Sequence, residues 1–119
     1  MKVSDQIIQF ANFFKQVEKY YKTAFDGVGY EDKLSNDLLH AIEFADNKRE
    51  RNRLTEELHI SRKNRRYYKD VTEELYPVIL YITDNEKAIN RLTNLLGEVR
   101  KAEDYHKDRT YRPRIKKEG

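Results

Sequence analysis

The feature that most constrains the fold is a stretch of 35 residues, 48–82, that contains no glycine and a single proline, Pro77. Its apolar side chains recur every three or four residues, which places them on one face of a helix. They are Leu54, Leu58, Tyr68, Val71, Leu75 and Ile79. We therefore predict one long helix over residues 48–82. We expect a kink at Pro77, which has no N–H to donate and crowds the carbonyl of Glu73.

Polar side chains interrupt this apolar stripe halfway along the helix. Ser61, Asn64 and Arg65 fall inside the apolar sector, where a helix that only had to pack would carry leucine. A charge within a buried stripe must be satisfied. Two interpretations remain open: a basic, polar pocket for an anionic ligand, or an ion pair within the chain. For the ion pair, Asp37 is the most plausible partner of Arg65.

The rest of the chain predicts three further helices. The first covers residues 4–25, and its heptad-like apolar seam is widened by Phe13 and Tyr20, so it has room to contact a second subunit. The sequence DGVG at 26–29 is expected to end it, because two close glycines supply a turn. Apolar residues at helical spacing predict the other two helices, over residues 31–45 and 85–105.

The resulting prediction is an all-α protein. It is a four-helix, antiparallel, bundle-like domain over residues 1–105 with one long kinked third helix. An extended basic tail over residues 106–119 follows the domain. The third helix exceeds its neighbours in length and leaves an apolar overhang at residues 76–82. Pairing with a second chain would cover this surface, so we expect a homodimer or a higher even oligomer.

Positive charge is concentrated in two zones. The net charge is only +3, but residues 48–69 hold nine basic against three acidic side chains, and residues 100–119 hold eight against four. The remainder is acidic. This distribution favours an anionic partner at a defined place over a general coating of nucleic acid.

Absent features exclude several classes of protein. The chain has no cysteine, which excludes disulfides, thiolate metal sites and cysteine nucleophiles. No apolar run approaches the roughly 20 residues of a membrane span, and the N-terminus has no signal-peptide pattern. We therefore expect a cytoplasmic protein that does not enter a membrane.

The strongest candidate site is the basic and aromatic run at residues 62–69. Arginine binds phosphate bidentately, and tyrosine rings offer faces on which a base can stack. The alternative interpretation is a solvated face whose arginine stems cover apolar surface. The basic tail is the second candidate, either clamping a phosphate ligand or wrapping a neighbouring subunit; a disordered, soluble end is its alternative. The predicted ligand-binding residues are Arg62, Arg65, Arg66, Tyr67, Tyr68, Lys69, His40, Asn94, Arg109, Tyr111, Arg112 and Arg114.

Neither metal binding nor catalysis is predicted. Each of the three histidines follows a carboxylate by three residues, a spacing found in di-metal helical bundles, but such pairs arise readily in a chain rich in acidic residues. There is no phosphate-binding glycine loop, no nucleophile elbow and no triad order. We expect a non-enzymatic protein without metal or cofactor.

Three segments carry a resemblance to known proteins: RKNRRYYKD at 62–70, LLGEVRK at 95–101 and RTYRPRI at 109–115. With them the chain resembles the small all-helical accessory proteins of phages and prophages of low-GC bacteria. The resemblance implies a sponge-type, counter-defence role, in which a small oligomer sequesters nucleotide signals of the host.

The function expected from the sequence is binding. The first hypothesis is a helical homo-oligomer that binds and sequesters a phosphate-bearing ligand, a nucleotide or a nucleotide-derived signal. The first alternative is a small nucleic-acid-binding regulator. The second is a protein-interaction module that docks on a host protein through its tail or the wide face of the first helix.

Overall fold

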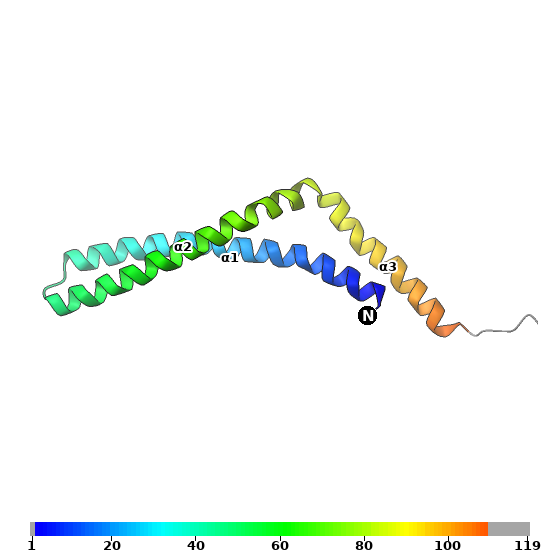
Figure 1. Ribbon diagram of the computed structural model, residues 1–119, viewed down its shortest axis with the longest axis horizontal. Helices are drawn as coiled ribbons and strands as arrows, with labels where there is room; N and C mark the ends of the chain where they lie inside the picture. Colours follow the sequence, from blue (N-terminus) through cyan, green and yellow to red (C-terminus); the bar gives the residue numbers. More distant parts are fainter. Residues whose placement is uncertain (1, 110–119) are drawn as a thin grey trace, which may run out of the picture. The chain divides into compact units, whose positions relative to one another are not determined.

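The computed structural model describes residues 2–109, which form three α-helices joined by short connections (Figure 1). The helices are α1 (Val3–Glu43), α2 (Lys48–Asp84) and α3 (Glu86–Asp108). Residues 2–109 contain no strand, so the predicted all-α class is confirmed for this range. The predicted site residues Tyr111, Arg112 and Arg114 lie outside the described residues.

Packing divides the chain into two compact units. One unit is residues 13–84, which comprises most of α1 together with α2. The other combines residues 1–12 with residues 85–119, and its described part contains the first turns of α1 and all of α3. The predicted helical domain of residues 1–105 thus comprises two units.

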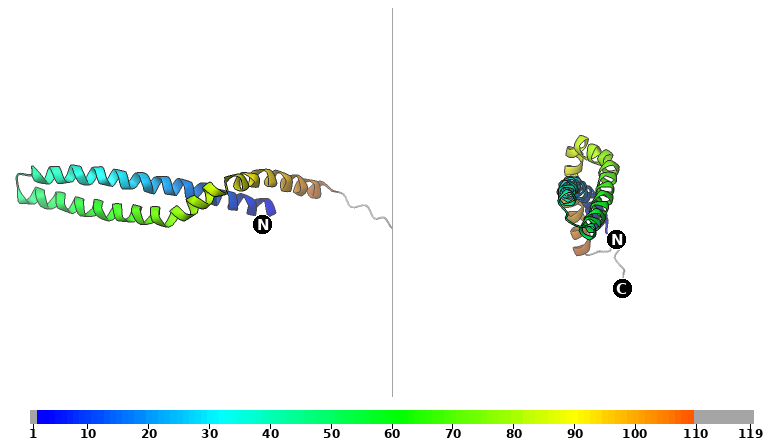
Figure 2. Two further views of the ribbon diagram at one scale, coloured as in Figure 1. Left: turned by 90° about the horizontal axis from the view of Figure 1, so that it is seen from above. Right: turned by 90° about the vertical axis from the view of Figure 1, so that its left-hand side faces the viewer.

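Within residues 13–84, α1 and α2 run antiparallel as a helical hairpin (Figure 2). The ring of Phe14 stacks on Tyr81 with 6.2 Å between centroids, and near the other end Ser35 Oγ lies 3.1 Å from Ser61 Oγ. One series of shielded positions on each helix alternates in steps of three and four residues, which is the heptad spacing of a coiled coil. They are 14, 17, 21, 24, 28, 31, 35, 38 and 42 in α1, and 54, 58, 61, 65, 68, 72, 75, 79 and 82 in α2. We call these positions the seam.

The predicted break at residues 26–29 is wrong, because α1 continues through both glycines. The predicted helices over 4–25 and 31–45 are one helix, so residues 2–109 contain three helices in place of four. The cause is tertiary packing. The seam keeps its spacing across the glycines, from Ala24 to Val28 and Glu31. Continuous contact with α2 outweighs the roughly 1 kcal/mol that each glycine costs a helix.

Gly27 has a packing role that the sequence did not indicate. A Cβ atom at this position would lie 2.7–2.9 Å from three ring atoms of Tyr68, so only glycine lets this ring approach the α1 backbone. Gly29 differs, because a Cβ there would meet no atom within 4 Å. The first glycine therefore serves the contact between the helices, whereas the second borders open space.

The long helix predicted over residues 48–82 is confirmed, since α2 continues through Pro77. Figure 2 shows its axis changing direction in the yellow-green part, toward its C-terminal end. Asn47 caps the start of this helix, because its Oδ1 accepts a hydrogen bond of 2.8 Å from the backbone N–H of Glu50. The next helix, α3, begins at Glu86 and extends to Asp108, three residues beyond the predicted end.

In the second unit, a side chain of α3 accepts a hydrogen bond from a free backbone N–H group at the start of α1. The carboxylate of Glu103 accepts a hydrogen bond of 3.2 Å from the backbone N–H of Ser4, in the first turn of α1 where N–H groups have no partner within the helix. The side chain of Ser4 is the largest cause that lowers the pKa of Glu103 below its ordinary 4.5; desolvation opposes the shift, and the Ser4 backbone N–H supports it.

We expect Gly27→Ala and Gly29→Ala to change stability in opposite directions. Gly29→Ala should raise the free energy of unfolding by about 0.5–1 kcal/mol, because alanine favours the helix and the site is open. Gly27→Ala should lower it, because the packed Tyr68 ring must move. Urea denaturation followed by circular dichroism measures both. Equal stabilisation by the two substitutions would show that Tyr68 does not pack as described.

Glu103 provides a test of the second unit. A carboxylate whose pKa is lowered on folding contributes stability above its unfolded pKa, and this contribution is lost as the pH falls through the folded pKa. Ser4→Ala removes the largest cause but leaves the backbone N–H, so the pKa of Glu103 should rise part of the way to 4.5. Side-chain NMR titration measures the change. An unaltered pKa in Ser4→Ala would show that the Ser4 side chain does not lower the pKa of Glu103.

Candidate functional site

Polar side chains occupy the middle of the hairpin seam on both helices. Ser61 of α2 is 2% exposed, and its hydroxyl lies 2.7 Å from a carboxylate oxygen of the buried Glu31 in α1. Ser61 Oγ also lies within hydrogen-bond distance of Ser35 Oγ and of the Glu31 carbonyl. Together with Asp32 and Arg65 these side chains form what we call the polar layer. Apolar seam residues flank it on both sides.

Arg65 forms an ion pair within the chain. Its Nε donates to Asp32 Oδ1 at 2.6 Å, and its side chain is 23% exposed. Of the two interpretations of the interrupted stripe, the structure shows the ion pair, with Asp32 as the partner in place of the predicted Asp37. The partner changed because α1 is continuous, which brings residues 31, 32 and 35 opposite Ser61 and Arg65. Asn64, also predicted inside the stripe, is exposed.

The two arms of the hairpin that meet at the polar layer have opposite charge. Residues 48–69 of α2 hold nine basic and three acidic side chains, a balance of +6. Residues 27–47, which include the facing part of α1, hold one basic and five acidic side chains, a balance of −4. The antiparallel pairing places these stretches side by side (Figure 2). The basic composition of residues 48–69 therefore has a counterpart in the same chain.

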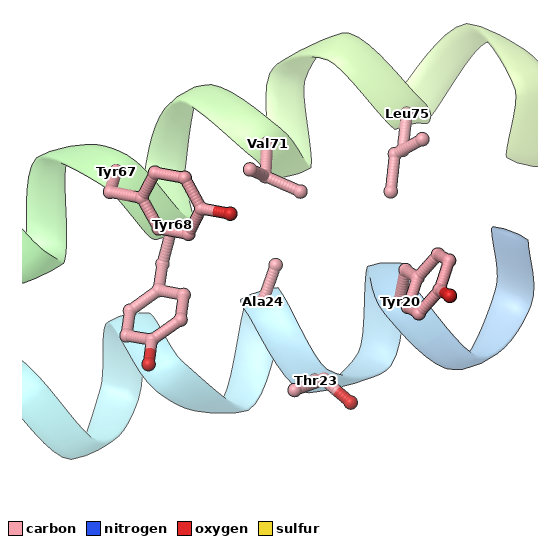
Figure 3. A pocket seen from close by; sticks show the side chains of 7 residues that line it. All are labelled: Tyr20, Thr23, Ala24, Tyr67, Tyr68, Val71 and Leu75. Atoms are coloured by element: carbon pink, nitrogen blue, oxygen red, sulfur yellow. The ribbon is translucent and has the colours of Figure 1, made fainter.

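Two grooves flank the seam next to the polar layer. The first, which we call the aromatic groove, has a volume of about 360 Å³ (Figure 3). Side chains from both helices line it, and none of them is charged: Tyr20, Thr23, Ala24, Tyr67, Tyr68, Val71 and Leu75. Figure 3 shows the Tyr20 and Tyr67 rings at its margins and Val71 opposite Ala24 across the opening. This groove is an apolar surface with tyrosine hydroxyls at its rim.

The second groove, which we call the charged groove, lies on the other side of the seam and has a volume of about 350 Å³. Its lining combines apolar and ionic side chains: Phe25, Val28, Gly29, Asp32, Arg65, Lys69, Thr72 and Glu73. Arg65 and Lys69 thus line one groove, while Tyr67 and Tyr68 line the other. The structure separates the predicted phosphate contacts from the predicted stacking rings.

The remaining predicted site residues are exposed and dispersed. Arg62 and Arg66 point away from the seam as exposed residues of α2. His40 is not part of the polar layer and does not pair with Asp37; its Nδ1 lies 3.9 Å from a carboxylate oxygen of Glu43. Two further predicted residues belong to the second unit: the exposed Asn94 of α3, and Arg109, which follows α3 in extended conformation.

Sequence reasoning missed the α1 half of the polar layer. Glu31, Asp32 and Ser35 were not among the predicted site residues. The signal was nevertheless present, because positions 31 and 35 continue the three- and four-residue steps of Phe14, Val17, Tyr21, Ala24 and Val28. The glycines concealed it by suggesting a turn.

Residues 2–109 contain no group of three His, Cys, Asp or Glu side chains that could hold a metal ion. None of the helices in this range combines the length and apolar character of a membrane span. No protein family, no curated protein and no solved structure matches the chain. The two grooves and the polar layer are therefore the candidate functional features of residues 2–109.

Ser61→Ala tests the polar layer. It removes the only side-chain donor to the buried Glu31 carboxylate among residues 2–109, so we expect the free energy of unfolding to fall by about 1–3 kcal/mol. Adding Glu31→Leu should recover most of this loss, because both partners are then apolar. Urea denaturation of wild type, single and double variants measures the coupling. Additive losses in the double variant would show that the hydrogen bond does not carry the effect.

Proposed function

We propose that the protein is a non-enzymatic binding module that acts through helix–helix association, and that its α1–α2 hairpin pairs with a second copy through the aromatic groove. The observation that carries this proposal is the uncharged lining of the groove between two long helices. Four helices would then pack together, two from each copy. This bundle would differ from the predicted one, which placed all four helices in a single chain.

Exposed aromatic side chains extend the surface beyond the groove itself. Tyr20 is 58% and Tyr67 64% exposed, and Phe13, one heptad before Tyr20 on the same face of α1, is 49% exposed. At 150–250 Å² for each ring, these fractions amount to roughly 350 Å² of coverable surface. A stable interface buries about 800 Å² on each partner, so three side chains would supply nearly half of it. Val71, Leu75 and Val78 would add to this area.

A second copy is the occupant that this surface fits best. In a twofold dimer the same patch lies on both sides of the interface, so a charged side chain close to the twofold axis would face its own copy. The aromatic groove avoids this penalty because no charged side chain lines it. The charged groove does not share this property, since Lys69 and Glu73 line it.

Binding and oligomerisation, both expected from the sequence, are part of the proposed function, and the two alternatives have less or equal support. A nucleic-acid-binding regulator is supported less, because the cations of residues 48–69 lie beside the acidic arm of the same hairpin. Docking on a host protein uses the same kind of surface as self-association. We infer that a phage accessory role, which the sequence resemblance suggests, would be exercised by such an assembly, by binding and not by turnover.

Tyr20→Lys and Val71→Asp should each convert the dimer to a monomer. Either substitution places a desolvated charge in the aromatic groove, which should weaken association at least a hundredfold. Phe44→Lys is the matched control, because Phe44 is an exposed aromatic residue 24 positions from Tyr20 along the chain. Sedimentation equilibrium of the full chain measures the dissociation constants.

The result expected is a dimeric wild type, a dimeric Phe44→Lys variant and two monomeric groove variants with unchanged helical circular dichroism. A wild-type chain that stays monomeric at the highest soluble concentration would overturn the proposal. Equal weakening by Phe44→Lys would also count against it, because the effect would then not belong to the groove.

A further inference from the structure

The charged groove contains two cationic side chains whose hydrogen-bond donors are not all paired within residues 2–109. Arg65 engages Asp32 through Nε alone, and among residues 2–109 its two terminal NH₂ groups have no further partner. Lys69, one turn along α2, is half-buried and forms no ion pair with any described residue. Arginine NH₂ groups and an ammonium group on neighbouring turns are suited to bind one phosphate or carboxylate.

An apolar surface continues from these cations toward α1. Val28 is half-buried, the ring of Phe25 is exposed, and both line the groove. Gly29 also lines the groove on α1, and a Cβ atom at this position would have no neighbouring atom within 4 Å. A flat, apolar group can therefore lie directly against the α1 backbone. A side chain at position 29 would occupy that space.

A carboxylate marks the other end of the groove. Glu73 lies eight residues beyond Arg65, about 12 Å along the helix axis. It forms no ion pair with any residue of 2–109, and an ionised carboxylate only accepts hydrogen bonds. A ligand that spans the groove must therefore present a donor at this end. A second anionic group there would be repelled.

We propose that the charged groove binds a small phosphate ester with a planar body and an amino group at the end remote from the phosphate. The phosphate would contact Arg65 and Lys69, the planar body would lie over Gly29 and Val28, and the amino group would donate to Glu73. A nucleoside monophosphate with an exocyclic amine, such as CMP, belongs to this class. The groove volume of about 350 Å³ falls within the range of small-molecule sites.

This site is independent of the proposed dimer, since the two grooves have no lining residue in common. The Tyr20→Lys variant of the aromatic groove should accordingly bind CMP like the wild type. Failure of the dimer and failure of the ligand site are thus distinguishable.

Isothermal titration of the full chain with CMP and UMP tests the proposal. The two ligands differ at the pyrimidine position where CMP has an amine and UMP a carbonyl oxygen. We expect CMP to bind about tenfold more tightly, which corresponds to one charge-assisted hydrogen bond. Glu73→Gln should reduce this preference to less than threefold, because the amide also offers a donor to the carbonyl of UMP.

Variants of the groove locate the site. Lys69→Ala should weaken CMP binding about tenfold, whereas Lys63→Ala, an equal loss of charge at an exposed position of α2, should leave it unchanged. Gly29→Leu should abolish binding while preserving the fold, because the added side chain enters open space in a helix. A second leucine variant, Gly97→Leu, is made at an equally open glycine of α3 and should bind CMP normally.

Three outcomes would overturn the proposal. The first is the absence of measurable binding of either nucleotide at low ionic strength. The second is equal weakening by Lys63→Ala and Lys69→Ala, which would indicate attraction to a basic surface without a defined site. The third is unchanged binding in Gly29→Leu, since the planar body could not then lie where we place it.

Discussion

The hydrogen bond between the Ser61 hydroxyl and the buried Glu31 carboxylate is the contact on which the hairpin depends. Two amphipathic helices with heptad seams can pair in several registers, each shifted by seven residues, because apolar side chains are interchangeable. A buried carboxylate is not interchangeable, since only the register that supplies its donor avoids a large desolvation cost. Ser61 faces Glu31 and Ser35 in one alignment of α1 and α2. The same alignment brings Asp32 to Arg65.

The long second helix and its interrupted stripe could be predicted from the sequence because they depend on local information. Residues 48–82 lack glycine, and the position of Arg65 among apolar residues predicts a satisfied charge. Whether α1 breaks at Gly27 and Gly29 depends instead on what lies opposite. The Tyr68 ring approaches at Gly27, more than 40 residues away in the sequence. Helix propensities do not include contacts with distant residues. The helix end at residues 26–29 was therefore predicted wrongly, and so was Asp37 as the partner of Arg65.

The number of charged residues in a segment predicts an anionic partner less well than the positions of those charges in the fold. The excess of positive charge in residues 48–69 suggested an external anion, but the facing stretch of α1 is acidic. Most of that excess is compensated within the hairpin. The cations left for the proposed ligand are Arg65 and Lys69. The guanidinium of Arg65, whose side chain is 23% exposed, still has donors after its ion pair is made. A site of this kind can be recognised only once the partner of each cation is known.

The two grooves have different chemistry because they lie on opposite sides of one seam. In α2, Val71 and Lys69 both neighbour the seam, but they are two positions apart. At about 100° per residue they diverge by about 200° and so reach opposite sides of the seam. Tyr68 connects the two sides. Its ring lines the aromatic groove, and its carbonyl accepts a hydrogen bond of 2.8 Å from the hydroxyl of Thr72, which lines the charged groove. The ring can occupy its position only because Gly27 has no Cβ. A single close approach between the helices thus lies between the two grooves, and it accounts for a glycine in the middle of a 41-residue helix.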